Sequence, residues 1–288
     1  MKHDFWTPVI VVAAALLVVL MGGCTGKATQ KDEKSAHVDV TVEVGDKPLN
    51  LSVYIDLSDR LIKQPGAVPQ MENDTAIINC VFEFFLDRCK KNILKNEDHF
   101  QVFFYPVPTH SNINLIAKSL NLDLGKAGAT MKKKAVKEFQ NTYKENLETI
   151  YTSTMNSKKW VGSDIWGFFS NKKVDQLCIK DGYRNVLVIL TDGYLFYEPN
   201  KIKQGNQYSY ILPQTLNNPK SSLIVKRGGL EELEVLMLEI SPKSPTERER
   251  MTQILSDWFS QMGVQKFVVN EADVSANTEA VITNFLKG

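Results

Sequence analysis

The chain has 288 residues, of which 43% are hydrophobic and 23% are charged, and this composition is typical of a folded domain with a buried core. Its formal net charge is +1, which does not favour binding to nucleic acid or to a strongly acidic partner. The length leaves room for one domain of about 240 residues after an amino-terminal leader.

The amino terminus has the pattern of a secretory signal. Lys2 precedes an apolar run from Val9 to Met21, which is too short to span a bilayer comfortably. Two glycines and Cys24 follow, an arrangement that resembles the lipobox of bacterial lipoproteins, although Met21 stands where that motif usually has leucine. The resemblance implies a signal peptide over residues 1–23 and acylation of Cys24. An uncleaved signal anchor is the alternative.

The rest of the chain divides into a tether and a domain. Residues 24–48 begin with a polar, charged stretch that predicts a solvated tether, and residues 38–44 alternate with period two, which favours an extra edge strand. Residues 49–288 alternate between short apolar runs and amphipathic segments. This alternation predicts an α/β fold, with a doubly wound, mostly parallel sheet that carries helices on both faces.

The expected elements follow from apolar periodicity and from breaker residues. We expect strands at Leu51–Asp56, Phe100–Val107, Val186–Leu190, Leu233–Ile240 and Lys266–Asn270. We expect helices from a cap at Asn73 or Asp74 to Leu86, and at Ile113–Leu124, Lys132–Met155, Trp166–Leu177, Pro245–Met262 and Thr278–Leu286. Residues 194–229 form a polar and aromatic insertion, either a recognition surface or a loop packed onto its own domain.

Oxygen-bearing side chains follow two of the buried strands. Connections between parallel strands are right-handed, so the carboxyl ends of the strands open on one edge of the sheet, where such folds hold ligands. We therefore expect four side chains to meet there, those of Asp56, Ser58, Ser163 and Asp192. Asp59 and Asp164 are secondary candidates. Carboxylate and hydroxyl oxygens suit Mg²⁺, or Mn²⁺ and Ca²⁺, better than zinc. Helix capping is the alternative role for these residues.

These residues also carry a family resemblance. Asp56 and Ser58 match the first two positions of the Asp-x-Ser-x-Ser motif of von Willebrand factor type A (vWA) domains. Ser163 stands where the family has a threonine, and residues 191–193 match its Thr-Asp-Gly motif. From Leu51 to Phe285 the chain thus resembles a vWA domain. The resemblance implies a three-layer fold and a divalent-metal site of the MIDAS type, at which a protein partner places an acidic side chain.

One departure bears on this site. Arg60 stands where the family has its second serine. A guanidinium cannot ligate a metal, and it would repel a cation if it pointed into the site. Asp59 or Asp164 could compensate for this charge, directly or through water.

The expected function is therefore that of a non-enzymatic binding module in the bacterial envelope. Lipidation would anchor it to a membrane, the outer membrane being favoured, facing the periplasm or the surface, with another envelope protein as partner. A metal-independent structural or assembly lipoprotein is one alternative. A hydrolase is another, since Asp56 and the later Thr-Asp-Gly faintly resemble haloacid-dehalogenase-like phosphatases. Those enzymes need a second acid where this chain has Ser58, and no histidine here lies in a motif.

The lipobox interpretation gives a first prediction. Cys24→Ser removes the acylated atom, so we expect the protein to be released from membranes or to accumulate as an unprocessed precursor. Fractionation and immunoblotting measure this, and a variant that stays fully membrane-bound at mature size would rule lipidation out.

Overall fold

The computed structural model describes residues 47–62, 68–107, 111–157, 162–195, 202–204, 207–209, 227–273 and 275–288. The expected signal peptide, Cys24, the strand at 38–44 and most of the insertion lie outside the described residues. In the part of the chain that the structure describes, no helix is long and apolar enough to cross a membrane.

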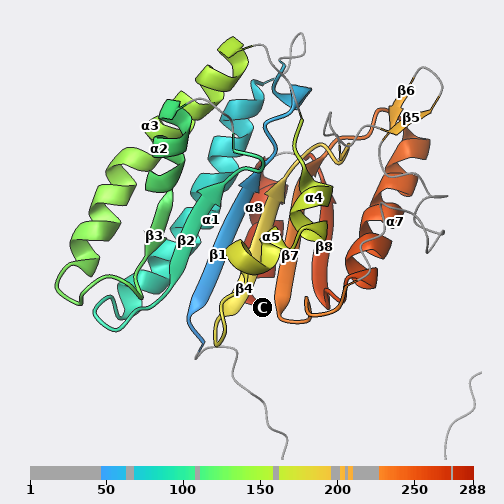
Figure 1. Cartoon of the computed structure of the whole chain (residues 1–288). Helices are drawn as coiled ribbons and strands as arrows, with labels where there is room; N and C mark the ends of the chain where they lie inside the picture. The colour runs from blue at the N-terminus through green and yellow to red at the C-terminus, as the bar shows by residue number, and fades with distance from the viewer. Residues whose placement is uncertain are drawn as a thin grey trace, which may run out of the picture. The chain divides into compact units, whose positions relative to one another are not determined.

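A six-stranded sheet in the order β3-β2-β1-β4-β7-β8 lies at the centre of the domain (Figure 1). Its strands are β1 (Leu49–Ile55), β2 (His99–Phe103), β3 (Asn121–Asp123), β4 (Arg184–Leu190), β7 (Leu233–Ile240) and β8 (Lys266–Glu271). All pair in parallel except β3, which is antiparallel to β2. A separate hairpin, β5 (Ile202–Gln204) and β6 (Gln207–Ser209), lies in the insertion. The predicted mostly parallel sheet is confirmed.

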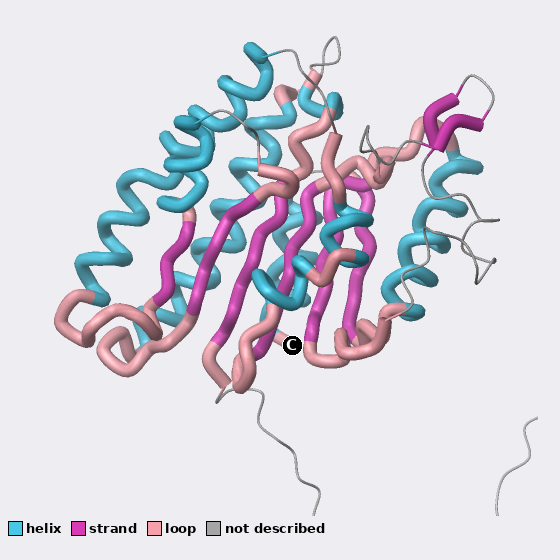
Figure 2. The backbone as a smooth tube through the Cα atoms, viewed as in Figure 1, coloured by secondary structure: helices cyan, strands magenta, loops and turns pink. Residues whose placement is uncertain are grey.

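Helices cover both faces of this sheet, as Figure 2 shows. Four pack on one face around a core that includes Val53 and Val188: α1 (Gln70–Lys91), α2 (Ser111–Ser119), α3 (Lys132–Ser157) and α8 (Ser275–Lys287). Three pack on the other face around Leu187 and Met237: α4 (Ile165–Ser170), α5 (Lys173–Cys178) and α7 (Pro245–Gln261). Since both faces are covered, the central strand β4 is apolar from Val186 to Leu190.

The start of the first long helix differs from the prediction. We expected Asn73 or Asp74 as its cap, but α1 begins at Gln70, and Pro69 precedes it without a side-chain cap. Asp74 lies inside the helix and is fully buried, where it pairs with an arginine. The short polar run before the apolar stripe was therefore a misleading signal, because one of its carboxylates has a tertiary partner.

Three other elements also differ. The helix expected at Ile113–Leu124 ends at Ser119, because the chain then turns into β3, a strand too short for a clear periodic signal. The strand expected to reach Val107 ends at Phe103. The helix expected at Trp166–Leu177 is split into α4 and α5 at Lys172, whose φ of 54° is left-handed. That conformation cannot continue a right-handed helix.

A buried histidine makes the stability of this sheet depend on pH. His99 at the start of β2 is 5% exposed, and its Nδ1 lies 2.6 Å from Oδ1 of Asn50 on β1. Burial, and secondarily the positive charge of Lys180, lower the pKa of His99 to about 4. An unfolded chain has a histidine pKa of about 6.5. Between these values the unfolded state binds more protons, so the free energy of unfolding falls as pH falls.

We expect the buried His99 to cost about 3 kcal/mol of stability between pH 7 and pH 4, since each pKa unit is worth about 1.4 kcal/mol. Urea denaturation across this range would show a steeper loss for the wild type than for His99→Gln, which has no titrating group at this position. Parallel stability curves for the two proteins would contradict the assignment.

Candidate functional site

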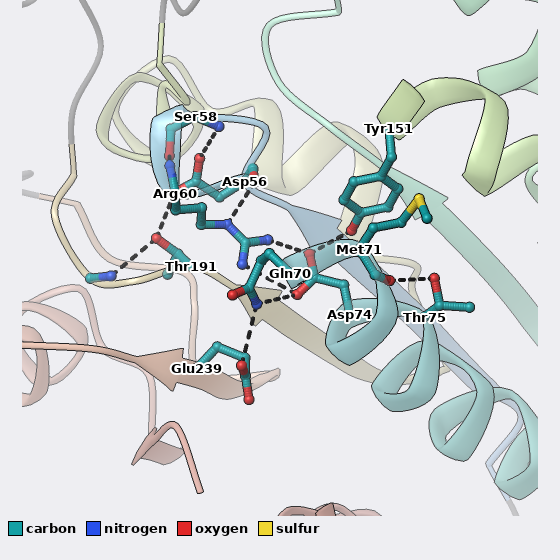
Figure 3. Close-up of polar contacts among 11 residues, drawn as sticks. Asp56, Ser58, Arg60, Gln70, Met71, Asp74, Thr75, Tyr151, Thr191 and Glu239 are labelled. Carbon is teal, nitrogen blue, oxygen red and sulfur yellow. Dashed lines mark hydrogen bonds and ion pairs between the residues drawn. The ribbon is translucent and has the colours of Figure 1, made fainter. Parts of the chain in front are cut away.

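Asp56 follows β1 and is held in place by the turn after it. The backbone N–H of Ser58 donates to Oδ1 of Asp56 at 2.9 Å, and the Thr191 hydroxyl donates to Oδ2 at 2.7 Å (Figure 3). Ser58 caps the short 3₁₀ turn Asp59–Leu61. Each carboxylate oxygen retains accepting capacity beyond these bonds. The carboxylate is thus fixed at the carboxyl edge of the sheet.

Asp192 follows the neighbouring strand β4. Its Oδ1 accepts the backbone N–H of Tyr194 at 3.0 Å, and its carbonyl accepts that of Ser241 at 3.0 Å. Gly193 has a φ of +89°, and a Cβ there would lie 2.5 Å from Sδ of Met251. Glycine is required in this turn, which leads the chain away from β4 directly after Asp192.

Ser163 reaches the same edge from the loop before α4. Its Oγ lies 2.7 Å from the hydroxyl of Tyr54 on β1, and that hydroxyl donates to the carbonyl of Tyr105 at 2.7 Å. A tyrosine hydroxyl has one proton, so Ser163 must donate to Tyr54. This leaves the lone pairs of Ser163 Oγ available to a cation. Among the described residues, no hydrogen bond joins Ser163 directly to Asp56 or Asp192.

The two secondary candidates have different surroundings. Asp164 caps α4, because its Oδ1 accepts the N–H of Gly167 at 2.8 Å. Asp59 is exposed in the turn after Ser58, and its charge contributes to raising the pKa of Asp192. Asp59 therefore influences Asp192 through its negative charge, whereas the Asp164 carboxylate has at least a capping role in α4.

The two main carboxylates oppose each other electrostatically. Burial raises the pKa of Asp56, and the charge of Arg60 together with the Thr191 and Ser58 hydrogen bonds only partly offsets this effect. Burial, and then the charge of Asp56, raise the pKa of Asp192 to about 7. Like charges in a desolvated place disfavour ionisation. A cation bound between these groups would relieve that cost.

Arg60 directs its guanidinium to the backbone of Asp56 and to a carboxylate on α1. Its Nε donates to the main-chain oxygen of Asp56 at 2.7 Å, and Nη1 and Nη2 donate to the two carboxylate oxygens of Asp74 on α1 at 3.2 and 2.6 Å (Figure 3). The side chains of Arg60 and Asp74 are 4% and 0% exposed. The arginine in the serine position therefore forms a buried, two-pronged ion pair with the helix.

Further side chains complete this network. Tyr151 of α3 donates to Oδ2 of Asp74 at 2.5 Å. The Gln70 amide donates to Oδ1 of Asp74 at 2.9 Å and to Oε2 of Glu239 at 3.3 Å. Sequence reasoning missed Asp74, Tyr151 and Gln70 as partners, since they come from two helices and no local pattern links them. A charged residue within an apolar helical stripe, as at Asp74, was the available signal.

The arrangement offers hard oxygen donors from three loops. Asp56, Ser58, Ser163 and Asp192 supply carboxylates and hydroxyls of the kind that Mg²⁺ prefers. Across the described ranges, no group of three or more His, Cys, Asp and Glu side chains is arranged to hold a metal ion. A cation here would therefore depend on hydroxyl and water oxygens as well as on two carboxylates.

Comparison with known proteins adds little to this site. No protein-family model and no curated protein sequence matches the chain. The pilus adhesin SpaC from Lactobacillus rhamnosus GG, in its open conformation, matches 84% of this chain at 14% identity and a TM-score of 0.39. Another form of SpaC matches 85% at 12% identity and a TM-score of 0.42. The chain spans 30% of the length of each SpaC chain, and similarity this distant carries no argument about function.

The buried ion pair gives a stability prediction. Asp74→Asn keeps the shape of the side chain but leaves the Arg60 guanidinium buried without a counter-charge, so we expect a loss of about 3–5 kcal/mol. For a domain of this size that corresponds to a fall of roughly 10 °C in Tm, measurable by calorimetry.

The matched control is Asp87→Asn on the same helix. Asp87 pairs with Lys90, and both side chains are 71% exposed, so this change is expected to cost under about 1 kcal/mol. Equal effects of the two substitutions would show that the Arg60–Asp74 pair is not a main source of stability.

Proposed function

We propose that this protein is a non-enzymatic binding module of the bacterial envelope, a divergent vWA-like domain that binds a partner protein at the carboxyl edge of its sheet. Asp56, Ser58, Ser163 and Asp192 hold a divalent cation, Mg²⁺ or alternatively Mn²⁺ or Ca²⁺, through their oxygens. The cation receives an acidic side chain of the partner.

The observation that carries the proposal is the placement of two carboxylates, Asp56 and Asp192, directly after the neighbouring parallel strands β1 and β4. Asp56 and Asp192 oppose each other at a ligand-binding edge, and the nearest guanidinium, Arg60, is engaged by Asp74. Two carboxylates balance the charge of a divalent ion and do not exceed it. Such an ion retains its attraction for an acidic group on a partner.

Exposed apolar side chains around the same edge support a protein partner. Ile62 and Val68 lie in the loop between β1 and α1, and Val107 lies in the loop that follows β2. These loops leave the carboxyl ends of neighbouring parallel strands, so the three residues belong to the same edge of the sheet as the candidate site. Apolar groups beside a polar centre are typical of protein–protein contact regions.

The proposed location follows from the amino terminus. A lipid on Cys24 would hold the domain at the outer membrane through the tether of residues 24–48, facing the periplasm or the surface. The partner would then be another envelope protein. A metal-independent assembly role is the second candidate, and Arg60 favours it, because this residue already supplies a fixed positive charge beside Asp56.

Calorimetric titration separates these candidates. We expect the full chain in detergent, after treatment with chelator, to release or absorb heat with Mg²⁺ or Mn²⁺, and to gain about 2.7 kcal/mol of stability at a hundredfold excess over Kd. Asp192→Ala should abolish both effects. Asp181→Ala, an exposed carboxylate just before the other end of β4, should leave them unchanged.

No heat and no thermal shift with either ion would contradict the metal site. Crosslinked pull-downs from membranes then decide the role: a partner captured equally with and without chelator supports the metal-independent candidate, and one lost in chelator supports the metal-dependent module.

A further inference from the structure

A small pocket lies between α1, α8 and the carboxyl end of β7. Its volume is about 120 Å³, and it is lined by Ile77 of α1, by Glu239 of β7, and by Thr278, Glu279 and Ile282 of α8, among others. Thr278 and Ile282 are one helical turn apart and so share a face of α8. We call this the α1/α8 pocket. Its walls combine apolar side chains with carboxylates.

A bulge in β7 aims Glu239 into this pocket. Met237 lies opposite Val269 of β8, but Ile240 lies opposite Glu271, so β7 has one extra residue between them. Glu239 has a φ of +69°, which is rare for a residue with a side chain. Met237 and Ile240 both face the α7 side, so Glu239 joins Leu238 on the α1/α8 side. A strained bulge that redirects an acidic side chain indicates a functional position.

Thr278 provides a second, independent observation. Its residue is 3% exposed, it lines the pocket, and its Oγ1 has no hydrogen-bond partner among the described residues. A buried hydroxyl without a partner costs free energy, so such a group in a native structure calls for a ligand or a water.

The charge of the pocket is negative. Glu239 is 8% exposed, and its Oε2 accepts a long hydrogen bond from the Gln70 amide at 3.3 Å. Burial and the charge of Asp74 raise the pKa of Glu239, although Gln70 and Arg60 act in the opposite direction. Glu279 adds a carboxylate on α8, and none of the described residues that line the pocket is basic.

We propose that the α1/α8 pocket binds a primary ammonium group carried on an aliphatic stem, as in a lysine side chain or a free diamine.

The shape and the donors of such a group fit the pocket. A cavity of about 150 Å³ holds benzene, so 120 Å³ is enough for an ammonium and the last methylenes of its stem. The three N–H donors of an ammonium match the carboxylates of Glu239 and Glu279 and the hydroxyl of Thr278. Ile77 and Ile282 provide apolar walls for the stem. The cation neutralises Glu239 and gives Thr278 the partner that it lacks.

Titration with n-butylammonium tests this proposal on the full chain in detergent. The experiment is run in excess chelator, so that its outcome does not depend on the metal site proposed above. We expect saturable binding of n-butylammonium, followed by calorimetry or by methyl NMR of the isoleucines. Neutral n-butanol, which has the same stem, is expected to bind at least tenfold more weakly.

Two variants locate the binding. Glu239→Gln keeps the side-chain shape and is expected to weaken n-butylammonium binding at least tenfold. Thr278→Val removes a hydroxyl that has no partner, so the fold is expected to keep its stability while binding weakens at least threefold. Glu148→Gln, an exposed position on α3, is the matched control and should change nothing.

Comparison of two ammonium ligands identifies the source of the bound ammonium group. Tighter binding of cadaverine than of Nα-acetyl-lysine amide supports a free diamine as the ligand, and the reverse order supports a lysine of a partner. Equal binding of n-butanol and n-butylammonium would overturn the proposal. So would unchanged ammonium affinity in folded Glu239→Gln and in Thr278→Val.

Discussion

The ion pair between Arg60 and Asp74 is the constraint on which this edge of the domain depends. Both side chains are almost completely buried, so each charge is tolerable only in the presence of the other. The pair joins the turn after β1 to the first helix, and it fixes the loop through the main-chain oxygen of Asp56. The backbone at Asp56 is therefore tied to a charge that belongs to α1.

The same hydrogen-bond network extends to Glu239 of β7. A single amide, that of Gln70, donates to both Asp74 and Glu239, so it links the ion pair to the α1/α8 pocket (Figure 3). The candidate metal ligands and the pocket both lie where parallel strands end, as is usual for ligands in open α/β sheets. Their different chemistry follows from the side chains: serine hydroxyls accompany the carboxylates at one place, and apolar walls with one threonine hydroxyl accompany them at the other.

Sequence predicted the architecture well where burial leaves a compositional trace. The run Val186–Leu190 is apolar throughout because both faces of β4 are covered, and its residues alone identify it as a central strand. β3 has three residues and leaves no such trace. The placement of Asp56 and Asp192 at the edge followed from strand order. The Arg60–Asp74 pair did not, since it joins a turn to a helix 14 positions away, and the positive φ of Glu239 has no local signal in a residue other than glycine.

The buried pair also restricts how this chain can diverge. Replacing Arg60 by serine would leave Asp74 as a lone buried anion, and replacing Asp74 first would leave a lone buried cation. Each single substitution destabilises the fold, so we expect residues 60 and 74 to change together during evolution. An uncharged residue at one of the two positions would be the intermediate. Correlated variation of residues 60 and 74 among related sequences would therefore reflect this ion pair.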